Sequence, residues 1–293
     1  MVCNSCPRRC GAERGEFTPG GVCASPALPR IARAAPHFGE EPCISGVNGS
    51  GTVFFSGCNL RCVFCQNAQI SRGGTGKTVS VQRLRDIFLE LQDKGVHNIN
   101  LVTASHYVEP VAEALREAKL FIPVAWNSSG YDSVDALRRL EGLVQIYMPD
   151  FKYASSEPAL RYSAAPDYPE VAKAAILEMF RQTGSFVLDE NDMLKSGVLI
   201  RHLILPDNER SSREVIDFVA DNFPGDMVLF SLMSQFTPMP GTERFPELQK
   251  TVTPELNDRL IDYMCARGIE YGFWQEPDSA TGEMIPAFDL TGV

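Results

Sequence analysis

Three cysteines in the segment Cys-Asn-Leu-Arg-Cys-Val-Phe-Cys, residues 58 to 65, have the spacing CxxxCxxC. Thiolates are ligands of zinc ions and of iron–sulfur clusters, and a closed site of either kind uses four ligands. A set of three leaves one metal position open to a small molecule, as catalytic zinc sites do. We therefore interpret Cys58, Cys62 and Cys65 as ligands of a [4Fe-4S] cluster with one open iron.

Zinc is the alternative metal for this segment. Zinc sites usually combine two CxxC pairs, and the neighbouring sequence contains no evident fourth ligand, which favours the cluster. The apolar run over residues 51 to 57 predicts a buried strand, so the three cysteines are expected on a loop that follows it. Phe64, directly before the last cysteine, is an aromatic residue that we expect beside a bound heterocycle.

The run FFSGCNLRCVFCQN resembles the signature loop of radical S-adenosylmethionine (radical SAM) enzymes. Later segments and the cysteine-rich start are similar to relatives of pyruvate formate-lyase activating enzyme, and the resemblance spans nearly the whole chain. It implies that the open iron chelates the amino and carboxylate groups of S-adenosylmethionine (SAM). It further implies reductive cleavage of SAM to methionine and a 5′-deoxyadenosyl radical. An electron donor such as flavodoxin or ferredoxin is then required, and a glycyl radical enzyme is a candidate partner.

A second group of cysteines comes first in the chain, at Cys3, Cys6, Cys10 and Cys23. Four thiols within so short a stretch are enough for a complete metal site, and either zinc or a second iron–sulfur cluster fits. Free thiols are the alternative. Many glycines and prolines and little hydrophobic periodicity mark residues 1–48, which we interpret as a cysteine-rich metal-binding extension.

The remainder, residues 49–293, alternates between two kinds of segment. Strands are predicted for the apolar runs at 51–56, 98–103, 121–126, 143–148, 197–205 and 227–232, with a further run at 269–274. Amphipathic helices are predicted at 79–95, 107–119, 133–141, 169–182, 211–222 and 254–267. This alternation predicts an α/β domain with a parallel sheet, in agreement with the partial (β/α)6 TIM-type barrel of radical SAM enzymes. Ligands of such sheets bind at the carboxyl ends of the strands.

The second and third predicted strands end in small polar residues. Many radical SAM enzymes have a Gly-Gly-Glu sequence after the second strand, where it binds the methionyl amino group. This chain has Thr103-Ala104-Ser105 there, so hydroxyls or backbone carbonyls are expected to take that role. The third strand ends in Asn127, with Ser129 two residues on, and amide and hydroxyl groups can bind a ribose or a carboxylate. Helix caps and turns are the alternative for both segments.

Charged residues lie at the next two strand ends. Asp150 and Lys152 are similar to the Asp-x-Lys element of glycyl-radical activating enzymes, where both lie near SAM or its accompanying cation. A solvated ion pair is the alternative. Arg201 lies inside an apolar strand, where it requires a partner and can clamp a carboxylate with two hydrogen bonds. These residues are candidates for cofactor binding, and the sequence identifies no catalytic side chain.

Composition limits the classes of function. A chain of 293 residues that is 44% hydrophobic can form one large domain around a single core. The net charge of −10 gives no overall attraction for nucleic acid or an anionic membrane. No run approaches the roughly 20 apolar residues of a membrane span, and the start lacks the apolar core of a signal peptide. We therefore expect a cytoplasmic protein whose nine cysteines are metal ligands more than disulfides.

Three functions remain compatible with these features. The leading one is a radical SAM enzyme that activates a glycyl radical enzyme by removing hydrogen from a backbone glycine. An enzyme of the same kind that acts on a small molecule or peptide is the second, since fold and cofactor do not determine the substrate. A non-catalytic iron–sulfur or zinc scaffold is the third. The four-cysteine extension counts against an ordinary pyruvate formate-lyase activase.

Overall fold

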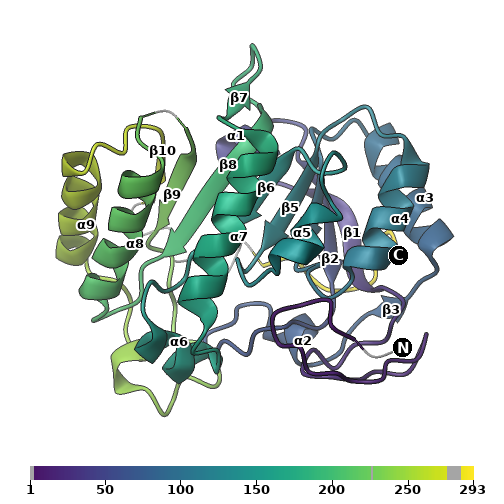
Figure 1. The fold of residues 1–293 in the computed structure, drawn as a ribbon, viewed down its shortest axis with the longest axis horizontal. Coiled ribbons are helices and arrows are strands. Elements are labelled where there is room, and N and C mark those ends of the chain that lie inside the picture. Colours follow the sequence, from purple (N-terminus) through teal and green to yellow (C-terminus); the bar gives the residue numbers. More distant parts are fainter. Residues whose placement is uncertain (1–2, 226, 276–284) are drawn as a thin grey trace.

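The strands of the computed structural model, which describes residues 3–225, 227–275 and 285–293, form one ten-stranded sheet. Its order is β10-β9-β8-β6-β5-β4-β2-β1-β3, with β7 paired to β8 (Figure 1). The strands are β1 (Arg30–His37), β2 (Ser50–Phe55), β3 (Lys77–Thr78), β4 (Ile99–Val102), β5 (Val124–Ser128), β6 (Ile146–Pro149), β7 (Val187–Leu188), β8 (Leu194–Leu203), β9 (Leu229–Met233) and β10 (Gly272–Trp274). From β2 to β10 along this path every neighbouring pair is parallel, whereas β1 is antiparallel to β2 and β3.

Nine helices accompany the strands in the described residues, and six of them connect successive parallel strands. They are α1 (Pro42–Ser45), α2 (Ala68–Ser71), α3 (Val81–Asp93), α4 (Val108–Ala118), α5 (Val134–Arg138), α6 (Ser156–Ser163), α7 (Tyr168–Thr183), α8 (Glu209–Asn222) and α9 (Pro254–Ala266), with a 3-10 turn at Pro246–Leu248. The connections β2-α3-β4, β4-α4-β5, β5-α5-β6, β6-α7-β8, β8-α8-β9 and β9-α9-β10 make six β/α units, so the predicted partial (β/α)6 barrel is confirmed. The sheet does not close, because β10 and β3 lie at its two ends.

The helix α3 illustrates how sequence produces these elements. Ser80 caps its start by accepting a hydrogen bond from the backbone of Arg83. Leu84, Ile87, Phe88 and Leu91 recur at helical spacing and are buried against the sheet. All strands in the parallel centre carry buried apolar residues on both faces, as sheets covered on two sides require.

Two strands begin later than their apolar runs predict. The run at 121–126 includes Phe121, which is exposed, and Pro123, and β5 starts only at Val124. The run at 143–148 begins in the turn after α5, where the backbone of Val144 still donates to the carbonyl of Leu140. Both predicted strands therefore began too early, because apolar residues of the preceding connection were counted as part of the strand.

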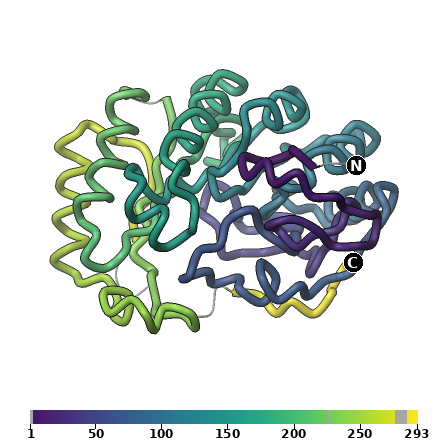
Figure 2. Tube along the Cα trace, turned by 60° about the horizontal axis from the view of Figure 1, so that its bottom comes forward, coloured from purple at the N-terminus to yellow at the C-terminus, as the bar shows by residue number. Residues whose placement is uncertain are grey.

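The described part of the predicted extension, residues 3–48, has three parts, the last of which, residues 38–48, contains α1. Residues 3–29 contain turns and isolated bridge pairing, and we call this segment the head. Residues 30–37 form β1, which sequence reasoning had not separated from the extension. On the outer side of β1, the backbone of Leu290 donates to Ala32 and that of Ala34 donates to Thr291. Figure 2 shows the last residues, in yellow, close to the head and the first strands.

The carboxyl ends of the parallel strands face the same side of the molecule as the head, α2 and α6, at the bottom of Figure 1. The short helix α1 and the β7 hairpin lie at the opposite end. Among the described helices, none is both long and apolar enough to cross a membrane.

Candidate active site

A cavity of about 460 Å³ lies at the carboxyl ends of the parallel strands. This volume is in the usual range for sites that enclose small molecules. Cys58, Cys62 and Cys65 all line it, together with residues from the ends of β4, β5, β6, β8 and β9. The loop with the three cysteines and the polar strand ends therefore face one common space.

The cysteine loop follows β2 through Gly57, which has a φ of +84°. Neighbouring groups donate hydrogen bonds to two of the sulfurs: the backbone of Leu60 to Cys58 at 3.4 Å and the Ser163 hydroxyl to Cys62 at 3.0 Å. The third sulfur, on Cys65, lies 3.3 Å from the hydroxyl of Ser71. Hydrogen bonds to ligand sulfurs are one of the means by which proteins set cluster potentials.

The donor set fits a cluster held by three thiolates. Burial raises the pKa of Cys58 and Cys62, and the nearby Cys65 raises both further, so thiolates here need positive charge beside them. A bound metal supplies such charge, and the ammonium of Lys152 also favours both thiolates. The cysteines that line the cavity are these three, which leaves the fourth corner of a cluster to a ligand.

No three His, Cys, Asp or Glu side chains of the described residues are arranged to hold one metal ion. A single zinc ion requires its sulfurs to converge at about 2.3 Å from one point. A cluster places each thiolate on a different iron, so its ligands stand farther apart.

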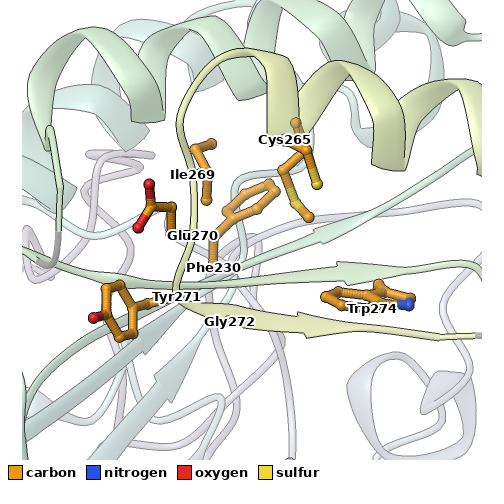
Figure 3. A pocket seen from close by; sticks show the side chains of 8 residues that line it. Phe230, Cys265, Ile269, Glu270, Tyr271, Gly272 and Trp274 are labelled. Atoms are coloured by element: carbon orange, nitrogen blue, oxygen red, sulfur yellow. The ribbon is translucent and has the colours of Figure 1, made fainter.

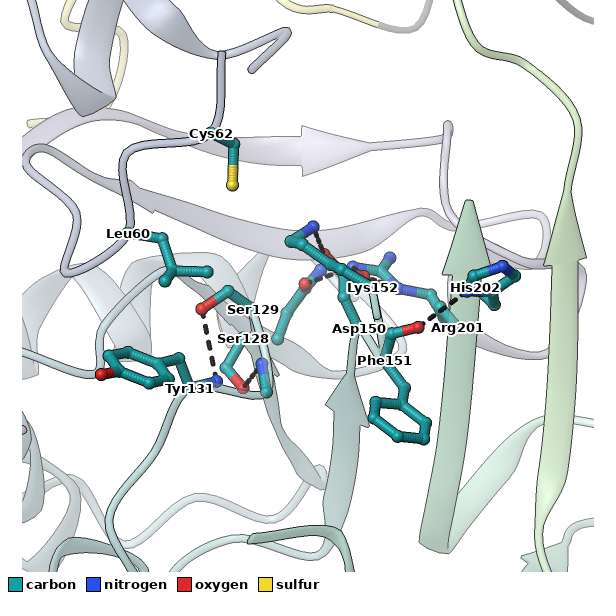
Figure 4. A network of polar contacts seen from close by, with 12 residues as sticks. Leu60, Cys62, Ser128, Ser129, Tyr131, Asp150, Phe151, Lys152, Arg201 and His202 are labelled. Atoms are coloured by element: carbon teal, nitrogen blue, oxygen red, sulfur yellow. Dashed lines mark hydrogen bonds and ion pairs between the residues drawn. The ribbon is translucent and has the colours of Figure 1, made fainter. Parts of the chain in front are cut away.

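A charged network lies beside the sulfurs (Figure 4). Lys152 Nζ is 2.7 Å from Asp150 Oδ2, and Arg201 Nε donates to Asp150 Oδ1 at 3.1 Å. Burial alone would raise the pKa of Asp150, but the charges of Lys152 and Arg201 outweigh it and hold that pKa below its usual value. Burial opposes the charge of Lys152 too, yet Asp150 and Cys62 keep its pKa above the ordinary value. The cavity thus presents fixed charges of both signs, which suits a zwitterionic ligand.

Two carboxylates that sequence reasoning missed belong to the same network. Glu40 accepts from Arg201 Nη1 at 2.8 Å and from Asn127 Nδ2 at 3.0 Å, and Glu41 lies 3.9 Å from Arg201. Burial raises the pKa of Glu41. Both directly precede α1 and line the larger cavity. The one signal for them was the requirement that a buried Arg201 have a partner.

The ends of β5 and β6 are joined by Tyr168, another residue that the sequence did not indicate. Its hydroxyl lies 2.8 Å from the carbonyl of Ser129 and 2.7 Å from that of Asp150, and it accepts a hydrogen bond from the backbone of Lys152. Gly130 has a φ of +74°, and a β-carbon there would lie 2.3 Å from the carbonyl oxygen of Asp150. The two strand ends are therefore packed as closely as glycine permits.

Seven of the eight predicted cofactor-binding residues line the cavity: Phe64, Thr103, Asn127, Ser129, Asp150, Lys152 and Arg201. Phe64 packs edge-on against Tyr153 and Phe236. Thr103 has a φ of +61°, a strained conformation for a β-branched residue and one that often marks a functional position. Ser105, by contrast, is buried outside the cavity lining.

The head packs against the cysteine loop. Arg8 Nε donates to the carbonyl of Asn59 at 2.8 Å, and Arg61 Nη2 donates to the carbonyl of Val22 at 2.9 Å. Its four cysteines are free thiols. Burial raises the pKa of Cys6 to about 11; a hydrogen bond from the backbone of Arg8 opposes the rise, and the charges of Cys23, Cys3 and Cys10 add to it.

A second cavity of about 280 Å³ separates α9 from β9 and β10 (Figure 3). Phe230, Met264 and Ile269 supply much of its lining, and the polar groups are few. Trp274 lines this cavity and the larger one, and its side chain is about half exposed. The lining of the smaller cavity does not suggest a catalytic or metal-binding site. The two cavities share Trp274.

The fold and the three-cysteine loop define the class of protein. The family described as the Radical SAM superfamily matches residues 52–219, more than half of the chain, and the chain belongs to this superfamily. Its members bind a [4Fe-4S] cluster and SAM, and the residues around the larger cavity fit both.

Individual relatives are more distant. The chain is 28% identical over 236 residues to Uncharacterized protein MJ0674 of Methanocaldococcus jannaschii, an alignment that covers 77% of this chain and 64% of that protein. This chain thus spans less than two thirds of that relative.

Solved structures agree with the fold. Streptococcus suis SuiB bound to precursor peptide SuiA has a TM-score of 0.51 at 16% identity, over 75% of this chain and 46% of that one. A domain of pyruvate-formate lyase-activating enzyme from Bacteroides vulgatus has a TM-score of 0.37 at 11% identity, over 67% of this chain and 91% of that one. The first of these likenesses concerns the fold alone, and the second is too low to carry an argument.

Proposed function

We propose that this protein is an enzyme that cleaves SAM reductively at a [4Fe-4S] cluster bound by Cys58, Cys62 and Cys65. When bound, the cluster supplies the electron that splits SAM into methionine and a 5′-deoxyadenosyl radical, which takes a hydrogen atom from the substrate and leaves a substrate radical. A cytoplasmic flavodoxin or ferredoxin provides the electron. The observation that carries this proposal is the single cavity shared by three cysteines and the charged strand ends.

The side chains of the cavity have distinct tasks in this reaction. Lys152 and Arg201 attract the carboxylate of SAM, while Asp150 attracts its amino group and sulfonium. Asn127 and Ser129 offer amide and hydroxyl groups to the ribose. The aromatic ring of Phe64 covers the cofactor and keeps water from the radical.

The substrate that we propose is a backbone glycine of a glycyl radical enzyme. Trp274 supports a macromolecular substrate, since it is half exposed at the edge of the cavity, and tryptophan is a frequent anchor of protein interfaces. Nucleic acid and membranes are excluded from the proposed partners, in keeping with the net charge of −10. A small molecule or a modified peptide is the alternative substrate.

Product analysis tests the proposed reaction. Anaerobically reconstituted protein with dithionite and SAM should form 5′-deoxyadenosine, and Cys58→Ala should lower the rate to the background of free SAM. Cys265→Ala is the matched control, because Cys265 is an exposed cysteine outside the larger cavity, and it should keep the wild-type rate. Equal product from Cys58→Ala and wild type would refute the proposal and leave a scaffold role.

A second experiment distinguishes the substrates. Cell extract is incubated anaerobically with the reduced enzyme and SAM and then exposed to oxygen, which cleaves a polypeptide at a glycyl radical. A SAM-dependent protein fragment is expected, whereas a change confined to metabolites or peptides would contradict glycine activation.

A further inference from the structure

Two cysteines of the head, Cys10 and Cys23, border one small space. The position that a β-carbon of Gly21 would occupy lies 3.1 Å from the sulfur of Cys10 and 4.0 Å from that of Cys23. The same position is 3.2 Å from Ala12, whose carbonyl accepts a hydrogen bond from the backbone of Cys3. Gly21 has a φ of +73°, so both its backbone and the space beside it favour glycine. The missing side chain leaves room between the sulfurs.

The sulfur of Cys3 is connected to the same loop as Cys23 through Arg14. Arg14 donates to the sulfur of Cys3 at 3.5 Å, and its Nε also donates to the carbonyl of Ser25, two residues after Cys23. Cys6 is buried, and its carbonyl closes a turn by accepting from the backbone of Arg9 at 3.1 Å. Besides burial, the charges of Cys23, Cys3 and Cys10 raise the pKa of Cys6, so its thiol lies near the other three.

The head has no regular secondary structure and no hydrophobic core of its own to stabilise it. Residues 3–29 have neither a helix nor an extended strand, and a segment this short cannot stabilise itself through a hydrophobic core. Small units of this kind depend on disulfides or on a structural metal. Its cysteines are free, and two of them, Cys6 and Cys23, are 8% and 7% exposed. Buried free thiols that gather in a coreless segment are the donor set of a thiophilic metal.

We propose that Cys3, Cys6, Cys10 and Cys23 bind a second metal centre, an iron–sulfur cluster, that fixes the head. As at the active site, these sulfurs are not arranged around one metal ion, which disfavours a single zinc ion. Each ligand releases its proton on binding, and metal binding is coupled to folding of the segment. The centre lies beside the cysteine loop of the active site: a β-carbon on Gly57 would lie 2.7 Å from the carbonyl oxygen of Cys23. With Arg8 and Arg61, this packing makes the centre a support for that loop.

Metal analysis on anaerobically purified protein tests this proposal. A variant with Cys58, Cys62 and Cys65 all changed to alanine removes the active-site ligands, and we expect it to retain one iron–sulfur cluster per chain. Adding Cys6→Ser to that variant should remove this remaining metal, whereas adding Cys265→Ser should not. Zinc content against iron plus sulfide identifies which metal the four thiolates bind.

Two results would overturn the proposal. One is a triple-alanine variant that contains no stoichiometric iron and sulfide, whether it holds zinc or no metal, and the other is equal metal content with and without Cys6→Ser. If the Cys6→Ser variant does not fold, Gly21→Ala keeps all four thiols and places a methyl group between two of them; undiminished metal in that variant would count against the site. None of these outcomes depends on SAM cleavage, so the proposed function and the second centre can fail separately.

Discussion

At the scale of single residues, Arg201 organises the charges of the cavity. Its side chain is 13% exposed and has three hydrogen-bond partners: Glu40, Asp150 and Asn127, the last at 2.6 Å from Nη2. A guanidinium has fixed donors in one plane, which a lysine ammonium cannot reproduce. The arrangement of the acids around Arg201 therefore depends on arginine, and a positive charge alone does not replace it.

We predict that Arg201→Lys destabilises the protein by about 2 kcal/mol, because at least one buried acceptor loses its donor. It should also weaken SAM binding at least tenfold through misplacement of Asp150. Chemical denaturation and equilibrium binding of SAM measure the two effects. Arg210→Lys is the control, since Arg210 pairs with Glu214 on an exposed surface and should change stability by less than about 0.5 kcal/mol. Equal effects of both substitutions would contradict the role of Arg201.

The residues that sequence could and could not predict differ in how local their signals are. The three cysteines lie within eight residues, so their spacing alone indicated a cluster. Glu40 is 161 positions from Arg201, and no motif contains both. Its role arises only when β8 and the segment before α1 meet inside the barrel. Sequence could state that Arg201 needs a partner, but not which residue supplies it.

At the scale of elements, α7 determines how closely two strand ends approach. Tyr168, its first residue, is fully buried and bonds to the loops after β5 and β6. These loops carry Ser129 and the Asp150–Lys152 pair. A helix on the outside of the sheet thus positions groups of the cavity through one hydroxyl.

Removal of that hydroxyl should be costly. We expect Tyr168→Phe to destabilise the protein by about 2 kcal/mol, because the backbone N–H of Lys152 loses its buried acceptor. The dissociation constant for SAM should rise several-fold while the content of active-site iron stays unchanged. The control is Tyr263→Phe, which removes a hydroxyl bonded to Asp217 away from the cavity and should leave SAM binding as it is. SAM affinity that is unchanged in Tyr168→Phe would show that α7 does not position these loops.

The elements were largely predictable because strands and helices alternate with clear periods. β1 was not, since its sequence Arg-Ile-Ala-Arg-Ala-Ala-Pro-His has few β-branched residues and contains a proline. It forms a strand because β2 and the segment at 290–291 both offer it hydrogen-bonding partners. α6 also lacked a strong apolar period and is held through contacts that are distant in the sequence.

At the scale of the whole molecule, two buried histidines make stability depend on pH. Burial lowers the pKa of His106 to about 3 and that of His202 to about 4. Both remain neutral in the folded protein, while the unfolded chain takes up protons near pH 6.5. Their contribution is therefore complete above pH 6.5 and is lost as the pH falls toward 4 and 3.

Between pH 7.5 and 5.5 each of these histidines should remove about 1.4 kcal/mol from the free energy of unfolding. His202→Asn should be less stable than wild type at pH 7.5. Between pH 7.5 and 5.5 its free energy of unfolding should fall by about 1.4 kcal/mol less than that of wild type, because one of the two histidines is missing. Guanidinium denaturation at both pH values, with equal metal content in the two proteins, measures the difference. Parallel declines would mean that His202 carries a proton in the folded state.

The pairing of residues 290–291 with β1 has a consequence for biosynthesis. A ribosome delivers β1 and β2 long before it delivers residues 290–291, so part of the outer edge of β1 lacks these partners during that interval. Open edges invite pairing with other chains. Slow translation of the segment before residue 290, or early termination there, should therefore yield aggregates, even though all nine cysteines have already been synthesised.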